Sequence, residues 1–455
     1  MLSNLMRAAL LAGISILFYL ISVLFYNVFF HPLRNVPGPF LAKITRLWLF
    51  FHDYTGNPHN YIRELHARLG PLVRISPNEV SINDAHANTS IYSQSNPWVK
   101  PAYHYKAFQS SAAYSIFTEL DPGTHAAHLR LLAPVFAQSR VTAPDAQHLL
   151  WEKSNAMIRG IRDGNGDRLA EKGARGDATV SLVRVFRSYA LDIVTTWTFG
   201  RCAESLERFE SDLFHVFDVA AESVIYFQHF PFLRALIPYI APLFPKLVPN
   251  KLLGQYAAQA LRDTREGVEA GEIDPNQTVF SNLASAAWQE KRGYKPSEGQ
   301  IISDGIVILA AGADTTAAAL SIGMHHLARQ PNLWRELQEE LRPMMDMFDR
   351  RPQIEKLAQL PLLNAVLNEG LRLSCPIRGH MPRVVPSTGW TYRGTYFPPG
   401  SVVATSAFYG CYNEDVFPQP DKYDPKRWLN VENRAEMEAH MQPFSRGTRQ
   451  CIGQK

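Results

Sequence analysis

Residues 444–453 read Phe-Ser-Arg-Gly-Thr-Arg-Gln-Cys-Ile-Gly and place Cys451 between two glycines. A cysteine thiolate can be the axial ligand of haem iron, and such a ligand favours cleavage of the O–O bond. Gly447 and Gly453 let the backbone turn sharply and approach a flat macrocycle closely. A lone cysteine is more often a buried structural residue, so this interpretation depends on the residues around it.

Two further residues of the loop suit the same task. Arg449 can form charge-assisted hydrogen bonds with a haem propionate, and Phe444 can shield the cysteine sulfur from water. The spacing Phe-x-x-Gly-x-Arg-x-Cys-x-Gly is filled at all five fixed positions, and it resembles the haem-binding loop of the cytochrome P450 family. The resemblance implies haem b as the cofactor, with Cys451 as the axial ligand of its iron.

Length and composition describe a large globular chain. Its 455 residues are 46% hydrophobic and 19% charged, which is ordinary for a protein with a large core. The net charge of +4 is too small to indicate nucleic-acid binding. The cysteines are widely spaced and form no CxxC pair, which favours a reducing compartment; they are Cys202, Cys375, Cys411 and Cys451.

An uncharged run of 23 residues, 8–30, lies near the start of the chain. As a helix it spans roughly 34 Å, enough to cross a hydrocarbon core of about 30 Å. It is longer than the apolar region of a cleaved signal peptide, and a buried core helix is the weaker alternative here. Because Arg34, Lys43 and Arg46 follow the run and only Arg7 precedes it, the positive-inside rule puts the body of the chain in the cytosol.

A stiff Val-Pro-Gly-Pro turn at 36–39 follows this run and cannot continue a helix. It resembles the proline-rich hinge of microsomal members of the same family. We therefore predict an anchor and hinge over residues 1–35 and a haem-thiolate catalytic domain over residues 36–455. The resemblance implies a single-pass protein of the endoplasmic reticulum membrane whose catalytic domain faces the cytosol.

The body of the chain has mostly helical apolar spacing, with a few alternating runs. We predict helices over 60–69, 121–136, 180–199, 206–226, a long helix from 298 that Pro331 ends, and 362–373, with strands over 72–75, 79–82 and within 384–403. Exposed or irregular segments are expected over 163–177, 227–249 and 413–442. The resemblance implies the cytochrome P450 fold, mainly α with a small β region beside the haem.

The long helix opens with a capping box formed by Ser297 and Gln300. Polar residues then interrupt its apolar sequence. Gly312 leaves room beside the helix, and the Thr315 hydroxyl can bond a backbone carbonyl one turn back, which widens a groove. A helix-packing cluster is the alternative interpretation. Beside the cysteine loop, the stretch resembles the oxygen-activation motif of the family, which implies that Asp314 and Thr315 deliver protons during catalysis.

Glu369 and Arg372 lie three residues apart in the helix over 362–373. Such pairs are common on solvated faces, where they contribute little. Together with Arg427 they resemble the buried Glu–Arg–Arg network that the family uses behind the haem.

The family resemblance also implies residues around the haem edge and the substrate. Arg383 matches a propionate-binding position, and His125 matches a cofactor-binding position where the family usually has an aromatic residue or histidine. The basic residue expected four positions after His125 is replaced by Leu129. Either Arg130, one place further on, reaches the propionate instead, or this propionate contact is missing. Substrate-lining residues, by family position, are Ile116, Ile308, Ala311 and Ile377.

The chain ends at Lys455, two residues after the cysteine loop. Family members continue with another helix and a β region that closes the substrate pocket, so the fold is expected to lack both.

The resemblance is closest to fungal microsomal cytochromes P450. It implies a monooxygenase that inserts one atom of dioxygen into a small apolar organic substrate, such as a secondary metabolite. Electrons are expected from NADPH–cytochrome P450 reductase, because the chain has no flavin or dinucleotide motif. The alternative is a non-catalytic membrane protein of the same fold, suggested by the early C-terminus. A haem-thiolate isomerase or dehydratase is disfavoured by the presence of Asp314 and Thr315.

Overall fold

The computed structural model describes residues 2–109, 113–163, 180–240, 250–275, 277–347, 351–430 and 432–454. Its first helices are α1 (Leu2–Phe25), α2 (Phe40–Ile44), α3 (Leu47–Tyr54), α4 (Pro58–Leu69), α5 (Asn88–Ile91), α6 (Ala102–Tyr105), α7 (Pro122–Leu132), α8 (Gln138–Val141), α9 (Pro144–Arg162), α10 (Leu182–Phe199) and α11 (Asp212–His229).

The later helices are α12 (Leu233–Ile240), α13 (Asn250–Glu269), α14 (Val279–Ala284), α15 (Ala286–Arg292), α16 (Glu298–Ala328), α17 (Pro331–Met347), α18 (Ile354–Leu357), α19 (Pro361–Ser374), α20 (Ala407–Cys411) and α21 (Arg434–His440). The strands are β1 (Leu72–Ser76), β2 (Glu79–Ile82), β3 (Arg383–Val384), β4 (Trp390–Tyr392), β5 (Thr395–Phe397) and β6 (Val402–Ala404). The described chain is therefore mainly helical with a small β region, as predicted.

The β region joins two distant parts of the sequence. The predicted hairpin forms as β1 and β2, and the sheet has the strand order β1-β2-β6-β3. β2 pairs with β6 in parallel, with Val80 opposite Val403. Sequence patterning predicts the strands but not this pairing, which brings the last third of the chain beside its start. The antiparallel pair β4–β5 forms a separate two-stranded sheet.

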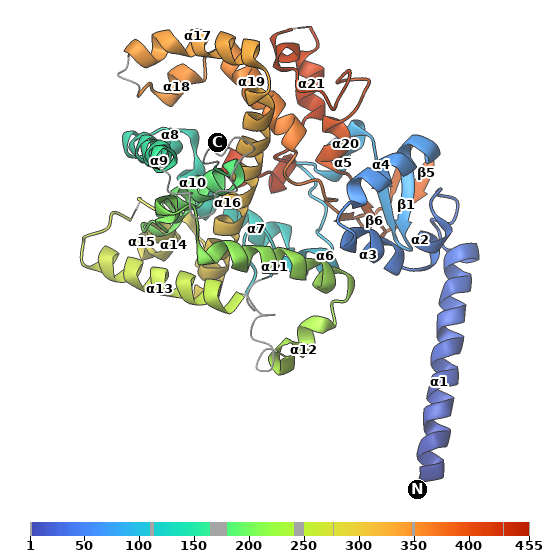
Figure 1. The fold of residues 1–455 in the computed structure, drawn as a ribbon. Helices are drawn as coiled ribbons and strands as arrows, with labels where there is room; N and C mark the ends of the chain where they lie inside the picture. The colour runs from blue at the N-terminus through green and yellow to red at the C-terminus, as the bar shows by residue number, and fades with distance from the viewer. Residues whose placement is uncertain are drawn as a thin grey trace.

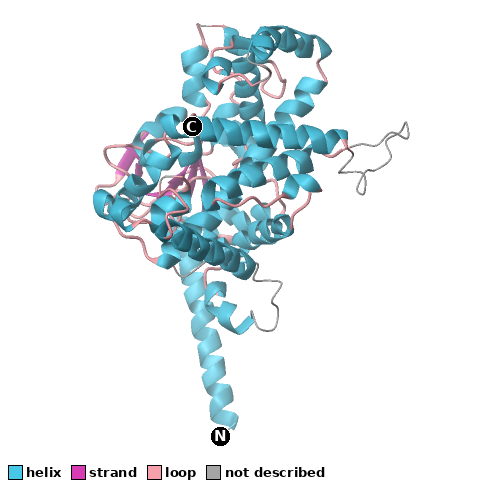
Figure 2. Cartoon of the chain, turned by 90° about the vertical axis from the view of Figure 1, so that its left-hand side faces the viewer, coloured by secondary structure: helices cyan, strands magenta, loops and turns pink. Residues whose placement is uncertain are grey.

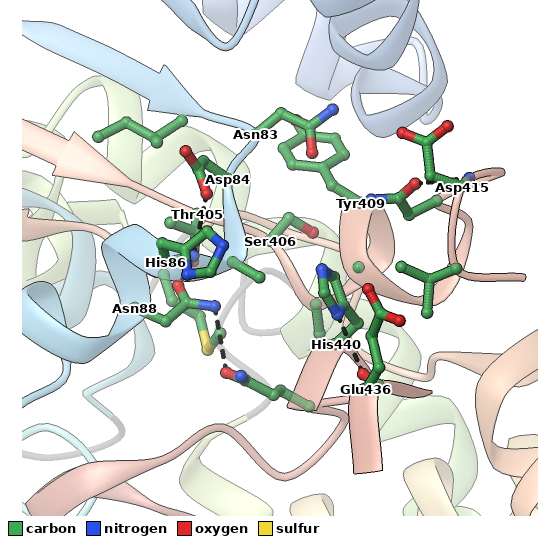
Figure 3. Close-up of a pocket in the computed structure, with 18 of the residues that line it drawn as sticks. Asn83, Asp84, His86, Asn88, Thr405, Ser406, Tyr409, Asp415, Glu436 and His440 are labelled. Carbon is green, nitrogen blue, oxygen red and sulfur yellow. Dashed lines mark hydrogen bonds between the residues drawn. The ribbon is translucent and has the colours of Figure 1, made fainter. Parts of the chain in front are cut away.

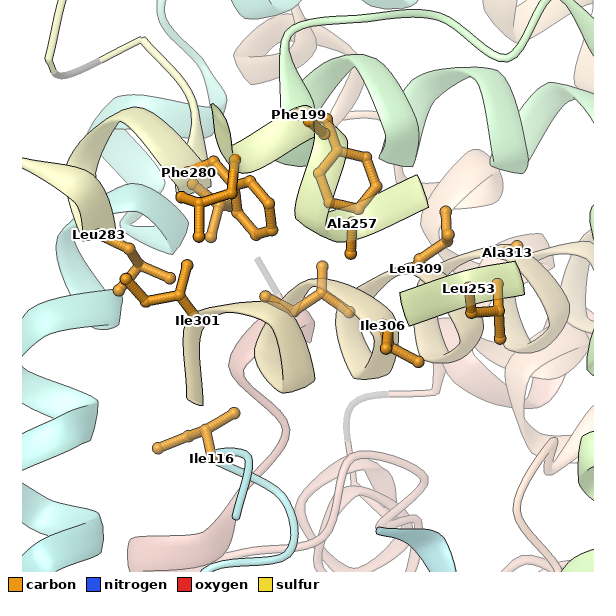
Figure 4. Packing of buried hydrophobic residues seen from close by; sticks show 14 of the residues in the cluster. Ile116, Phe199, Leu253, Ala257, Phe280, Leu283, Ile301, Ile306, Leu309 and Ala313 are labelled. Carbon is orange, nitrogen blue, oxygen red and sulfur yellow. The ribbon is translucent and has the colours of Figure 1, made fainter. Parts of the chain in front are cut away.

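The long helix α16 runs through the middle of the helical body (Figure 1). The predicted capping box forms, because the Ser297 and Gln300 side chains each bind the other residue's backbone N–H. Its apolar residues pack against α10, α13 and α14 in the main core cluster shown in Figure 4. The labelled members of this cluster are Ile116, Phe199, Leu253, Ala257, Phe280, Leu283, Ile301, Ile306, Leu309 and Ala313.

Helix α1 projects away from the body in both views of the chain (Figures 1 and 2). Residues 10–30 of the chain form an apolar helical span long enough to cross a membrane, and almost none of it is buried. Helix α16 is also long and apolar enough, but a much larger share of it is buried, and several of its apolar residues belong to the main core cluster. The N-terminal span is therefore the candidate membrane anchor.

Residues that precede the predicted catalytic domain, before position 36, are already packed into the folded body. Asn27 and Leu33 are buried, at 7% and 0% exposure, and Leu33 belongs to a core cluster with β1 and β2. The fully buried Arg74 of β1 donates from Nη1 to the carbonyl oxygens of Asn27, at 3.2 Å, and Leu33, at 3.5 Å. Residues of the segment 27–35, which was predicted to be part of the anchor and hinge, thus pack against the folded body.

Two predicted irregular segments contain helices. Helix α12 occupies part of 227–249, and residues 241–249 lie outside the described residues. Helix α21 lies within 413–442. Of the loop predicted over 163–177, all but the first residue lies outside the described residues.

Candidate haem and oxygen site

The cysteine loop is closed by its own backbone. The Cys451 N–H donates to the Phe444 carbonyl at 2.9 Å. Gly447 has a φ of +75°, and a side chain there would collide with the carbonyl oxygen of Tyr92. Glycine is therefore required at 447 both for backbone conformation and for space. Gly453 differs from the prediction, because its φ of −86° is open to other residues.

Cys451 lies near the end of this loop and is exposed as a residue. A Cβ atom at Gly453 would lie 3.9 Å from the sulfur, an ordinary van der Waals contact, so space alone does not require glycine at this position. Desolvation raises the pKa of the Cys451 thiol, and a hydrogen bond from the Gly453 backbone opposes the rise. A metal cation at the sulfur would stabilise the thiolate. The next residue, Ile452, packs against the main core cluster that also contains Ile308 of α16.

Four basic side chains from separate segments gather beside the loop. Arg383 of β3 and Lys100 are 3% and 5% exposed, and both contact Tyr105: Arg383 Nη1 donates to its hydroxyl at 2.7 Å, and Lys100 Nζ lies 4.4 Å from its ring centroid. Arg449 borders the same narrow hollow as Arg383 and donates from Nη1 to the Glu119 carbonyl at 2.7 Å. His125 of α7, at 5% exposure, completes the group.

These basic groups disfavour one another's protonated, charged forms. Desolvation, followed by the charges of Arg383 and Arg449, lowers the pKa of Lys100 well below its ordinary value. Desolvation and the Arg449 charge lower the pKa of His125 to about 3. Desolvation and Arg383 lower the pKa of Arg449 to about 10, although Glu119 partly opposes them. Buried charges of one sign are costly unless an anion lies among them, and the two propionates of haem fit this requirement.

The structure brings together three of the four basic residues predicted at the haem edge, and Lys100 takes the place of the fourth. Arg130 is exposed on α7, and Leu129 packs against the main core. Lys100 was not singled out from the sequence. The available signal was weak: a single lysine in the aromatic and proline-rich stretch Trp-Val-Lys-Pro at 98–101.

The predicted oxygen motif divides between two sides of α16. Thr315 Oγ1 donates to the Ala311 carbonyl at 2.6 Å, as expected one turn back, and Ala311 is exposed. Gly312 does not open a groove. A side chain there would lie 2.8 Å from Val194 Cγ2 of α10, so the missing side chain allows the two helices to pack. The packing interpretation therefore holds for the glycine, and the accessible side of the motif is the one carrying Ala311.

Asp314 is paired with α10. Arg187 donates from Nε to Asp314 Oδ1 at 2.7 Å, and from Nη2 to Asp218 Oδ1 of α11 at 2.6 Å. The Asp314 side chain keeps 41% exposure, so its carboxylate is in reach of solvent while it is held by the guanidinium.

The predicted Glu–Arg–Arg network forms in the interior. Glu369 and Arg372 are fully buried and make a two-pronged ion pair at 2.8 and 2.9 Å. Arg427 Nε and Trp428 Nε1 donate to the same carboxylate at 3.2 and 2.8 Å. Arg372 also donates to backbone carbonyls of the segment that leads to the cysteine loop, at Cys411, Pro420 and Lys422. The network fastens this segment to α19.

Comparison with known proteins matches the chain to one family. A family model described as cytochrome P450 matches residues 36–455. The chain belongs to the cytochrome P450 family. It is 28% identical over 433 residues to cytochrome P450 monooxygenase aflU of Aspergillus parasiticus, covering 94% of this chain and 84% of the relative. It is 27% identical over 462 residues to cytochrome P450 monooxygenase aneF of Aspergillus aculeatus, covering 98% and 89%.

Family membership gives the cofactor and the class of reaction. This cytochrome P450 is a haem-thiolate monooxygenase whose haem b iron has a cysteine ligand. It uses dioxygen, an organic substrate and a redox partner. The N-terminal apolar helix agrees with an anchored member of the family.

The predicted substrate-lining residues of the P450 fall into two groups. Ile116 and Ile308 lie in the main core cluster, at 7% and 8% exposure, whereas Ala311 and Ile377 are exposed. Phe117, next to Ile116 in the sequence, is 40% exposed.

A polar hollow of about 340 Å³ lies apart from these residues, between the β region, α20 and α21 (Figure 3). Its lining includes Asp84, His86, Asp415, Glu436 and His440. None of the predicted haem, oxygen or substrate residues lines it.

Proposed function

We propose that Cys451 is the thiolate ligand of the haem, and that Arg383, Arg449, Lys100 and His125 hold its propionates. One observation supports this proposal: four basic groups, whose charged forms disfavour one another, converge around the loop that carries the exposed Cys451. An anionic group would relieve the repulsion among the basic groups, and a metal cation would stabilise the Cys451 thiolate. Haem supplies both.

The haem supplies the activation of dioxygen, and the protein supplies ligation, orientation and protons. We assign proton transfer to Asp314 and Thr315. The exposed part of the Asp314 carboxylate can take protons from solvent, and the Thr315 hydroxyl lies on the adjacent position of α16. Because Arg187 holds Asp314 toward α10, the carboxylate must leave this guanidinium to pass a proton inward.

The substrate that fits this site is a small apolar organic molecule. The accessible candidates for its contacts are Ala311, Ile377 and Phe117, which are all apolar. The fungal P450 monooxygenases similar to the chain support a role in secondary metabolism. NADPH–cytochrome P450 reductase is the proposed electron donor.

We also propose that the N-terminal helix anchors the protein in the endoplasmic reticulum, with residues 36–455 as the cytosolic catalytic domain. The basic residues after the helix support this orientation. A glycosylation acceptor fused after Arg46 should stay unmodified in microsomes, and its modification would reverse the orientation.

The test of the haem assignment is the absorption spectrum of the reduced carbon-monoxide complex. The parent protein should show the long-wavelength Soret band of a thiolate-ligated haem. Cys451→Ala should lose that band, while Cys202→Ala, a cysteine on another loop, should keep it. Retention of the thiolate band in Cys451→Ala would refute the assignment, and absence of haem from the parent would support the non-catalytic alternative.

A further inference from the structure

A fully buried pair of ionisable groups joins α16 to α7. Asp304 and His128 both have 0% side-chain exposure, and Asp304 Oδ2 lies 2.7 Å from His128 Nε2. The other carboxylate oxygen, Oδ1, accepts the backbone N–H of Ile116 at 2.7 Å. Asp304 lies ten positions before Asp314, so it is well separated from the oxygen motif along α16. One carboxylate thus connects two helices and the loop that precedes α7.

The loop contacted by Asp304 forms a tight, buried corner. The Ser115 N–H donates to Thr118 Oγ1 at 2.9 Å, and the Thr118 N–H donates to Ser115 Oγ at 3.2 Å. Lys100 Nζ donates to the carbonyl of Phe117. The corner is therefore fixed on one side by Asp304, through Ile116, and on the other side by a member of the basic cluster.

The side chain carried by this corner is apolar and accessible. The Phe117 ring meets the Phe108 ring edge-to-face, with 5.4 Å between centroids, and the two residues are 40% and 37% exposed. Lys100 Nζ lies 4.7 Å from the centroid of the Phe117 ring. Because Lys100 belongs to the cluster proposed to hold the propionates, a haem bound there would have its edge near Phe117.

We propose that the Asp304–His128 pair positions this corner so that Phe117 forms an apolar wall of the substrate site and restricts the shapes that fit. The inference rests on the proposed haem assignment. Asp304 and His128 are positioning residues, since they act through the Ile116 backbone. The specificity-determining contact is made by the Phe117 ring.

If Asp304 only stabilised the core in general, any comparable buried aspartate should have the same effect when it is replaced. Asp192 of α10 is such an aspartate and provides the matched control. Its side chain is also buried and also binds backbone: it accepts the N–H groups of Ser205, at 2.8 Å, and Leu206, at 3.1 Å. Asp192→Ala should weaken the fold in a similar way but leave the corner at 115–118 in place.

The experiment compares two iron ligands of different size in the full chain loaded with haem. Imidazole is too small to contact the Phe117 ring when it binds the iron, whereas the phenyl ring of 4-phenylimidazole has to pack against it. Asp304→Ala and Phe117→Ala should each weaken 4-phenylimidazole binding about tenfold, the value of one aromatic contact. Imidazole binding should change less than about threefold. Asp304→Asn, which keeps an oxygen for the Ile116 N–H, should recover part of the loss.

Amide hydrogen exchange supplies a readout that does not require haem. Peptides covering 113–120 should exchange faster in Asp304→Ala and Asp304→Asn than in the parent, and Asp192→Ala should leave them unchanged. The proposal would be overturned if the Asp304 variants kept the parental ratio of 4-phenylimidazole affinity to imidazole affinity. It would also be overturned if peptides covering 113–120 exchanged equally fast in the Asp304 and Asp192 variants. A parent chain without haem would refute the haem assignment instead, and hydrogen exchange would still test the positioning.

Discussion

Arg187 donates to both carboxylate oxygens of Asp314, with 2.7 Å from Nε to Oδ1 and 3.3 Å from Nη2 to Oδ2. The guanidinium is shared with Asp218 of α11. Three helices therefore meet at the proposed entry point for protons. Movement of α11 would alter the hold on Asp314 and so the supply of protons.

Asp314→Asn should slow turnover about a hundredfold, because proton-transfer groups typically contribute at least that much. The amide remains within hydrogen-bonding reach of Arg187 but cannot carry the proton. The measurement is the rate of NADPH consumption with reductase and an apolar substrate, in water and in deuterium oxide. Asp218→Asn removes the other carboxylate on Arg187 and should have a much smaller effect. If both variants were slowed equally, Asp314 would act through its ion pair with Arg187 and not by transferring protons.

Thr315→Ala should bind haem and substrate nearly normally but release more hydrogen peroxide for each NADPH consumed. Without the hydroxyl, protons are no longer directed to the productive position. The measurement is the ratio of product to NADPH consumed, with peroxide quantified in parallel. The control is Thr316→Ala, which removes an exposed hydroxyl at the next position. A parental ratio in Thr315→Ala would show that another group performs this task.

Lys100→Met should release haem faster, by about ten- to a hundredfold, because a buried charge-assisted hydrogen bond to a propionate is lost. The measurement is the transfer of haem to apomyoglobin. Arg130→Met tests the position that the sequence favours, and its exposed side chain predicts no change. The reverse ranking of the two variants would assign this propionate contact to Arg130 instead of Lys100.

Arg372→Ala should destabilise the protein by about 3–5 kcal/mol, because it leaves the buried Glu369 carboxylate without its main partner. The exposed pair of Arg434 and Glu438 on α21 provides a matched comparison, with side chains half exposed. Arg434→Ala should cost less than about 1 kcal/mol. Thermal melting of both variants measures the difference, and similar melting temperatures would contradict the buried network as a main support of the segment before the cysteine loop.

Deletion of residues 2–25 should release the protein from membranes while keeping its melting temperature, since this segment makes few contacts with the body. Deletion of residues 2–35 should also release it, but should lower the melting temperature. The longer deletion removes buried Leu33 and two carbonyls that accept from Arg74. Sedimentation after alkaline extraction and a thermal melt separate the two effects. Equal melting temperatures would place residues 27–35 outside the folded body.

Several features were fixed by short segments of the sequence. The capping box at Ser297 and Gln300, the β1–β2 hairpin and the cysteine loop each depend on residues within about ten positions of one another. Such local patterns set backbone conformation directly, through capping, alternation and glycine geometry. They predicted a mainly helical fold with a small β region, and the cysteine loop suggested the cofactor through its resemblance to the cytochrome P450 family.

Contacts between distant segments were decided only by the tertiary structure. Gly312 faces α10 instead of an open groove, and Lys100, rather than Arg130, joins the basic cluster. Asp304 reaches a loop 188 positions earlier in the chain. The physical reason is that a charged side chain has the same sequence signature whether it is solvated or buried. Its partner is determined by which helices pack together, and that packing depends on the shape of the whole apolar core.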